Sequence, residues 1–318
     1  MKIVVLERNS VGPDIPVDFS ELGEVTYYAN TVTVEEVKER VKDADIIVAN
    51  KSPIRAETLE TAPNVKLICE FATGYDNVDL EYCKSRGIRV CNVVDYSTAM
   101  VAQHTFALAL YVSQKLRHYD DYVKSGEYAA QSRFSNFDIP FTELDGKTWG
   151  IVGMGNIGRR VAKIAESFGC RVIFYSITGK SSVTEYEQVD FETLLKESGY
   201  LSLHCPLSDL SRSLIDAAAL SKMKKSAILV NVARGPVVNN ADLAEALENG
   251  TIAGAGLDVL EKEPITLDNP LSKQMDSKKL IITPHLAWGS VEARMRCVEG
   301  VRENIKAFQA GGIRNAVV

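Results

Sequence analysis

The chain has 318 residues, of which 25% are charged, and its formal net charge is −6. A chain of this length exceeds what one hydrophobic core usually holds, so we expect two domains with a cleft between them. The charge is modest and includes no run of Lys and Arg, which argues against a nucleic-acid surface. We therefore expect small-molecule partners, with neither nucleic acid nor membrane among them.

The six cysteines are scattered without CxxC spacing, and several lie in apolar, strand-like runs such as 65–69. A thiol in such a run behaves as a small hydrophobe, so we expect a reducing compartment and no metal site. The N-terminal apolar run is too short for a signal peptide, and no stretch approaches the roughly 20 apolar residues of a membrane span. We expect a soluble, cytoplasmic protein.

The first third of the chain alternates short β-rich runs with amphipathic helical runs, a pattern typical of a parallel, doubly wound sheet. The expected strands are 3–6, 25–28, 46–48 and 67–71, and the expected helices are 34–42 and 79–85.

A long helix is expected over 97–117, where Ser97 and Thr98 can cap its start. It is apolar nearly all round, which indicates burial and favours a subunit contact. A polar, aromatic stretch follows over 119–146, and the last helix is expected over 290–310. Between them lies a second series of strands, 148–152, 171–175, 201–204, 227–231 and 254–259. The fold class is therefore α/β with two doubly wound parallel sheets.

A glycine-rich segment follows the strand 148–152 and opens a helical run, which is the context of a dinucleotide-binding turn. Its glycines let the backbone approach a pyrophosphate closely, and the helix N-terminus supplies amide donors and partial positive charge. The residues expected to bind the cofactor here are Gly153, Gly155, Asn156, Ile157 and Gly158.

The next strand ends without the acidic residue that would bind the ribose 2′-hydroxyl of NAD. Ser176, Thr178 and Lys180 stand there instead and offer hydroxyl and ammonium donors, which slightly favours NADP. The alternative, in which Ser176 binds the ribose of NAD and Lys180 is solvated, stays open.

Three later strands end in polar residues, at the strand ends where ligands bind in this architecture. Reducing a 2-keto acid requires a cation for the carboxylate, an acid for the forming alkoxide and a partner for that acid. Arg234, His285 and Glu263 supply one each. Taken singly, each also has an ordinary structural interpretation: a surface arginine, a core histidine and a solvated glutamate.

Together, in this order and framing, the three residues resemble the D-isomer-specific 2-hydroxyacid dehydrogenases. The segments 50–53, 72–79, 96–104 and 204–207 are similar to that family too, most of all to its glycerate dehydrogenase and hydroxypyruvate reductase group. The resemblance implies a flavodoxin-like substrate-binding domain, 1–99 with 289–318, and a Rossmann dinucleotide-binding domain, 100–288. It also implies a homodimer and a substrate such as hydroxypyruvate or glyoxylate.

The family's residue roles carry over to matching positions. The resemblance implies that Arg234 binds substrate, that His285 is the general acid and base, and that Glu263 hydrogen-bonds the imidazole. It also implies that Thr73 and Gly74 hold the substrate carboxylate through backbone amides, whereas Lys51 either lines the same cleft or is solvated. The remaining cofactor contacts implied are Asp258 on the nicotinamide carboxamide, Val232 and Ala233 on its ribose, and Pro206 and Ser211 at the adenosine end.

One alternative of another class is a dinucleotide-sensing corepressor, which would require a peptide groove or tail that we do not find. Among enzymes, a formate dehydrogenase would show Gln in place of Glu263. A phosphoglycerate dehydrogenase often carries a further domain after the last helix, whereas this sequence ends at Val318.

Overall fold

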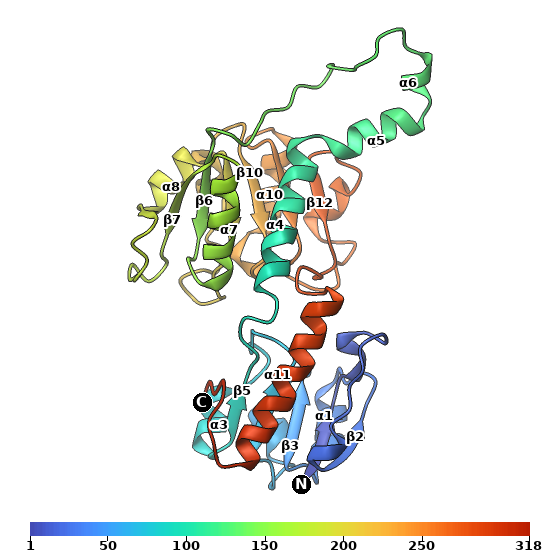
Figure 1. The fold of residues 1–318 in the computed structure, drawn as a ribbon, viewed down its shortest axis with the longest axis vertical. Helices are drawn as coiled ribbons and strands as arrows, with labels where there is room; N and C mark the ends of the chain where they lie inside the picture. The colour runs from blue at the N-terminus through green and yellow to red at the C-terminus, as the bar shows by residue number, and fades with distance from the viewer. The chain divides into compact units, whose positions relative to one another are not determined.

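The computed structural model describes all residues from Met1 to Val318. The chain forms two compact units: unit 1 comprises Met1–Ser97 with Gly289–Val318, and unit 2 comprises Thr98–Trp288. Each unit contains one parallel sheet with helices packed against it (Figure 1). None of the helices combines the length and the apolarity that crossing a bilayer requires.

Unit 1 has a five-stranded sheet in the order β2-β1-β3-β4-β5, and every neighbouring pair is parallel. This is the flavodoxin-like order, in which the winding reverses between β1 and β3. Helices α1 to α3 bury their apolar side chains against the sheet, and α11 packs against β4. The bounds are β1 Lys2–Val5, β2 Glu24–Tyr27, β3 Ile46–Ala49, β4 Leu67–Glu70, β5 Arg89–Cys91, α1 Val34–Val41, α2 Ala56–Leu59, α3 Leu80–Ser85 and α11 Val291–Gln309.

Unit 2 has a seven-stranded sheet in the order β12-β11-β10-β9-β6-β7-β8, again parallel throughout. The winding reverses between β6 and β9, as in a Rossmann fold, and β12 adds a strand to the usual six. The strands are β6 Thr148–Val152, β7 Arg171–Tyr175, β8 Glu187–Gln188, β9 Tyr200–Leu203, β10 Ile228–Asn231, β11 Gly254–Leu257 and β12 Leu280–Ile282. The helices are α4 Thr98–Ser113, α5 Leu116–Lys124, α6 Glu127–Ala130, α7 Asn156–Ser167, α8 Phe191–Glu197, α9 Ala217–Lys222 and α10 Asn240–Glu248.

Two separate cores form on the two faces of the unit 2 sheet. One is built with α4 and α7 around the fully buried Trp149, whose indole stacks on Tyr200. The other is built with α8, α9 and α10. Apolar residues cover both faces of this sheet, which explains why its strands are continuous apolar runs. The predicted α/β fold class is confirmed.

The predicted helix over 97–117 is wrong at its C-terminal end. Helix α4 ends at Ser113, and Lys115 has a left-handed backbone with φ of 56° before α5 begins. Helix α4 packs against α7 and the sheet, whereas α5 buries no residue, so the apolar surroundings end where α4 does. Helices α5 and α6 and the following loop extend away from the body of unit 2 as an arm, residues 114–141 (Figure 1).

Candidate active site

The glycine-rich turn after β6 has the geometry that a dinucleotide requires. Gly153 has φ of 91°, and a Cβ there would lie 2.9 Å from the His204 carbonyl oxygen. A Cβ on Gly158 would lie 2.2 Å from the Gly153 carbonyl oxygen, so this glycine allows α7 to pack tightly on the turn. Gly155 caps α7 and faces open space, where a pyrophosphate could approach the helix N-terminus.

The turn after β7 closes on itself through hydroxyl groups. Ser176 Oγ donates to the Lys180 carbonyl oxygen over 3.0 Å, and Thr178 Oγ1 reaches the same oxygen over 3.4 Å. The Lys180 side chain is exposed. The Tyr175 carbonyl accepts from the Gly153 amide, which places this turn beside the glycine-rich turn.

The segment after β9 lies across the point where the winding of the sheet reverses. Ser211 is fully buried, and its hydroxyl donates to the Pro206 carbonyl over 2.8 Å, so it closes the loop that displays Pro206. His204, whose backbone flanks the Gly153 turn, has a buried Nδ1 without a hydrogen-bond partner. An unpartnered buried polar atom and an open glycine cradle beside one another fit a bound dinucleotide.

Arg234 follows β10 in a turn held by Asn231. The Asn231 side chain accepts from the Ala233 amide and donates to the Arg234 carbonyl, each over 3.0 Å. Val232 and Ala233 form this turn, and Arg234 Nη1 donates to the Ala233 carbonyl over 2.8 Å. A Cβ on Gly235 would lie 1.8 Å from the Leu260 carbonyl oxygen, so only glycine lets this turn approach the loop that leads to Glu263.

Glu263 and His285, which follow the neighbouring strands β11 and β12, are in direct contact. His285 Nδ1 lies 2.6 Å from Glu263 Oε2, and Glu263 Oε1 accepts from the Leu260 amide over 3.0 Å. The backbone of His285 is left-handed, with φ of 53°. It is held there because its amide donates to the carbonyls of Asp258 and Thr283 and its carbonyl accepts from Trp288 Nε1. Nε2 is then the ring nitrogen left for a substrate.

Asp258 is buried at the end of β11 and holds the His285 loop from beneath. Its carboxylate accepts from the amides of Leu286 and Ala287 over 2.9 and 2.8 Å and from Thr283 Oγ1 over 2.6 Å. His104 Nε2 on α4 lies 3.0 Å from Thr283 Oγ1. Burial lowers the pKa of His104, and the Asp258 carboxylate opposes this shift. The sequence did not predict a role for Thr283, because no motif connects it with His104, which lies 179 positions earlier in the chain.

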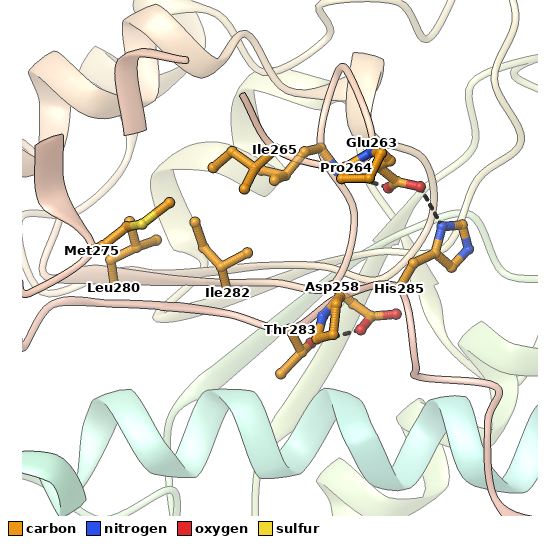
Figure 2. A pocket seen from close by; sticks show the side chains of 11 residues that line it. Asp258, Glu263, Pro264, Ile265, Met275, Leu280, Ile282, Thr283 and His285 are labelled. Atoms are coloured by element: carbon orange, nitrogen blue, oxygen red, sulfur yellow. Dashed lines mark hydrogen bonds and ion pairs between the residues drawn. The ribbon is translucent and has the colours of Figure 1, made fainter. Parts of the chain in front are cut away.

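A cavity of about 600 Å³ in unit 2 is lined in part by His285 and Glu263. Figure 2 shows Glu263 and His285 at one end, Asp258 and Thr283 beneath them, and apolar side chains at the other end. The apolar wall consists of Leu260, Pro264, Ile265, Met275, Leu280, Ile282 and Pro284. Neither Arg234 nor the glycine-rich turn lines this cavity.

The three residues expected to bind substrate from unit 1 follow neighbouring strands. Lys51 comes after β3 and its side chain is exposed; Thr73 and Gly74 come after β4. The Thr73 hydroxyl donates to the Val93 carbonyl over 2.9 Å, and its carbonyl accepts from Asn92 Nδ2 over 2.7 Å. These bonds hold the Thr73–Gly74 backbone at the end of the sheet.

A Rossmann unit with a glycine-rich turn, and a histidine paired with a carboxylate at the ends of adjacent strands, define an NAD(P)-dependent oxidoreductase. A model of the "D-isomer specific 2-hydroxyacid dehydrogenase, NAD binding domain" matches residues 106–287. The chain belongs to the D-isomer-specific 2-hydroxyacid dehydrogenase family.

Relatives match along essentially the whole chain. A glycerate dehydrogenase of Methylorubrum extorquens is 38% identical and covers 99% of this chain and 98% of its own. A hydroxypyruvate reductase of Blautia hydrogenotrophica is also 38% identical, over 100% of this chain and 99% of its own. A solved acyclic imino acid reductase in complex with NADPH and D-Arg has a TM-score of 0.90 at 30% identity, with 100% of both chains covered. These relatives support the enzyme and not the corepressor alternative.

Proposed function

We propose that this oxidoreductase reduces a short 2-keto acid, such as hydroxypyruvate or glyoxylate, to the 2-hydroxy acid. The contact of 2.6 Å between His285 Nδ1 and Glu263 Oε2 carries this proposal, because it orients an imidazole to donate a proton from Nε2. The relatives named glycerate dehydrogenase and hydroxypyruvate reductase support the substrate class.

Each residue of the proposed site has one task. Arg234 binds the keto-acid carboxylate with its planar guanidinium and polarises the carbonyl. His285 Nε2 gives its proton to the carbonyl oxygen, and Glu263 stabilises the imidazolium before the transfer. Lys51, Thr73 and Gly74 of unit 1 are further proposed substrate contacts. A bound nicotinamide supplies the hydride.

The cofactor belongs to unit 2 in this proposal. The open cradle at Gly155 receives the pyrophosphate together with the Asn156 and Ile157 amides at the start of α7. Val232, Ala233 and Asp258 border the nicotinamide side, and Pro206 and Ser211 border the adenosine side. The proposed substrate-binding domain, residues 1–99 and 289–318, corresponds to unit 1, and the proposed dinucleotide-binding domain, residues 100–288, corresponds to unit 2; the boundary of the units lies two residues earlier, after Ser97.

A substrate panel tests the activity directly. The oxidation of NADPH and NADH is followed through the absorbance of the reduced nicotinamide ring at 340 nm. The substrates compared are hydroxypyruvate, glyoxylate, pyruvate and branched keto acids. We expect the highest kcat/KM with hydroxypyruvate or glyoxylate. Absence of turnover with every 2-keto acid would contradict the proposal.

We propose a preference for NADP over NAD, since the turn after β7 holds two hydroxyls and the exposed Lys180 but no carboxylate. The test compares kcat/KM for NADPH and NADH in the wild type and in Lys180→Ala. A wild type that prefers NADH would contradict this part.

A homodimer and a cytoplasmic location complete the proposal. The arm presents Phe134 and Phe137, which are 88% and 76% exposed, and the proposed dimer would remove their rings from water. All six cysteines are free and buried, which suits a reducing compartment.

A further inference from the structure

The carboxylate of Glu7 lies at the point where the winding of the unit 1 sheet reverses. Glu7 comes two residues after the end of β1, next to the end of β3, and is 8% exposed. Its Oε2 atom accepts hydrogen bonds from three successive amides, those of Asn50, Lys51 and Ser52, over 2.7, 2.8 and 2.9 Å.

Successive amides that converge on one point form a binding site for an anion. In a doubly wound sheet, the position between β1 and β3 is also where a ligand is usually bound. Here the chain's own carboxylate occupies it. The three amides are therefore not available to a substrate carboxylate, and the exposed ammonium of Lys51 is the group that this loop presents to solvent.

Other buried contacts hold the same loop. Ser52 Oγ donates to the Thr31 carbonyl over 2.9 Å, and Asn77 Nδ2 donates to the Ser52 carbonyl over 3.0 Å. Asn77 also lies 3.3 Å from both oxygens of the fully buried Glu70. Burial and the nearby carboxylates of Glu7 and Asp76 raise the pKa of Glu70, which favours the neutral form of this side chain.

We propose that Glu7 is a positioning residue for the keto acid: it fixes the backbone of residues 50–52 and thereby the place from which Lys51 contacts the substrate. This inference rests on the proposed function, in which Lys51 binds the keto acid. Glu7 touches neither substrate nor cofactor. Since the contact of Lys51 would be similar in the ground state and the transition state, its loss should change KM and not kcat.

The experiment is a kinetic comparison of Glu7→Ala, Glu7→Gln and the control Glu21→Ala, with hydroxypyruvate and NADPH. Glu21 is another carboxylate of unit 1, which pairs with Arg302 and Lys306 on α11 and does not contact the loop. We expect Glu7→Ala to raise KM for hydroxypyruvate about tenfold, with kcat and KM for NADPH within about twofold of the wild type. Glu21→Ala should change none of the three.

Chemical rescue distinguishes positioning from general damage to the fold. Removing the Glu7 side chain empties the site formed by the three amides, so added formate should bind there and lower KM towards the wild-type value. Glu7→Gln keeps the volume filled and should not respond to formate. In a Lys51→Met background, Glu7→Ala should raise KM no further, because both changes remove the same contact.

The possible outcomes separate this inference from the function beneath it. A wild type that reduces no 2-keto acid would overturn the proposed function and the inference with it. A wild type that reduces hydroxypyruvate, together with a Glu7→Ala variant that keeps the wild-type KM, loses kcat alone, ignores formate or adds to Lys51→Met, would overturn the inference alone. If Glu7→Ala does not fold, Glu7→Gln carries the test with a smaller expected rise in KM, and an unchanged KM in that variant counts against the inference.

Discussion

His285 is held at three of its atoms before any ligand arrives: its amide, its carbonyl and its Nδ1 all have partners. The left-handed backbone at this position is one that L-residues other than Asn, Asp and His seldom adopt, and these contacts compensate for its cost. What remains is one ring nitrogen in a fixed direction. Such orientation is the requirement for a general acid.

Replacing His285 with Gln removes the proposed proton donor and retains a polar side chain. We expect kcat for keto-acid reduction to fall about a hundred to ten thousandfold, with KM for NADPH little changed, because the cofactor contacts lie on other strands. Steady-state kinetics with NADPH titrated at saturating keto acid measure both quantities. A variant with nearly full turnover would remove His285 from the mechanism.

His204 shows how burial shapes the response of the fold to acid. Trp149 Nε1 donates to Ser202 Oγ, and the same hydroxyl oxygen lies 3.0 Å from His204 Nε2. Burial lowers the pKa of His204 from 6.5 to about 3. In this pH range His204 is protonated in the unfolded chain but not in the folded chain. The free energy of unfolding therefore falls as pH decreases from about 6.5 towards 3.

We therefore expect the thermal midpoint of the wild type to fall between about pH 7 and pH 5 by more than that of His204→Gln. The Gln amide can still form a hydrogen bond with Ser202 but does not titrate. Differential scanning fluorimetry of both proteins across this range measures the effect. Parallel pH profiles would show that His204 does not contribute to the acid sensitivity.

At the scale of elements, two glycines in the turn between β6 and α7 have different tasks: Gly158 is needed for packing, and Gly155 is proposed to bind the cofactor. A Cβ on Gly158 would collide with the Gly153 carbonyl, whereas a Cβ on Gly155 would enter open space. Gly158→Ala should therefore lower the thermal midpoint of the protein even without cofactor. Gly155→Ala should leave the midpoint unchanged and raise the Kd for NADPH, because its methyl group would enter the place proposed for the pyrophosphate.

Fluorescence titration of NADPH and thermal unfolding of the same two variants provide the measurement. Equal losses of stability in both would mean that Gly155 is also needed for packing. Equal affinities for NADPH in Gly155→Ala and the wild type would mean that the pyrophosphate lies elsewhere.

The sequence predicted those elements whose local pattern is strong. The strand, the glycine-rich segment and the helix at 148–167 form one continuous signal, and polar residues at strand ends pointed to Arg234, Glu263 and His285. Strands β5 and β8 were not predicted, because three and two residues show no alternation. The end of α4 depends on where the neighbouring sheet and helix end, and the contact of His104 with Thr283 depends on tertiary packing. Neither the end of α4 nor this contact produces a periodic pattern in the sequence.

At the scale of the whole molecule, the arm determines the expected assembly. Its exposed phenylalanines are costly in water unless another surface covers them, and the proposed dimer would cover them. We expect the double variant Phe134→Ser, Phe137→Ser to shift the molecular mass measured by light scattering from dimer towards monomer. The control variant is Ile313→Ser, because Ile313 is an apolar residue of unit 1 that is 76% exposed. A wild type that is monomeric at all concentrations would contradict the dimer.

All six thiols lie inside the cores of the two units, and burial raises the pKa of each one. An alkylating reagent needs an accessible thiolate, so the native protein should remain unlabelled by maleimide and should gain six adducts only after denaturation. Intact-mass spectrometry would show this. None of the native cysteines would then react with a thiol-specific dye, so one cysteine introduced at Ser135 on the arm would carry a single dye. Energy transfer between two chains labelled in this way would follow their association in real time.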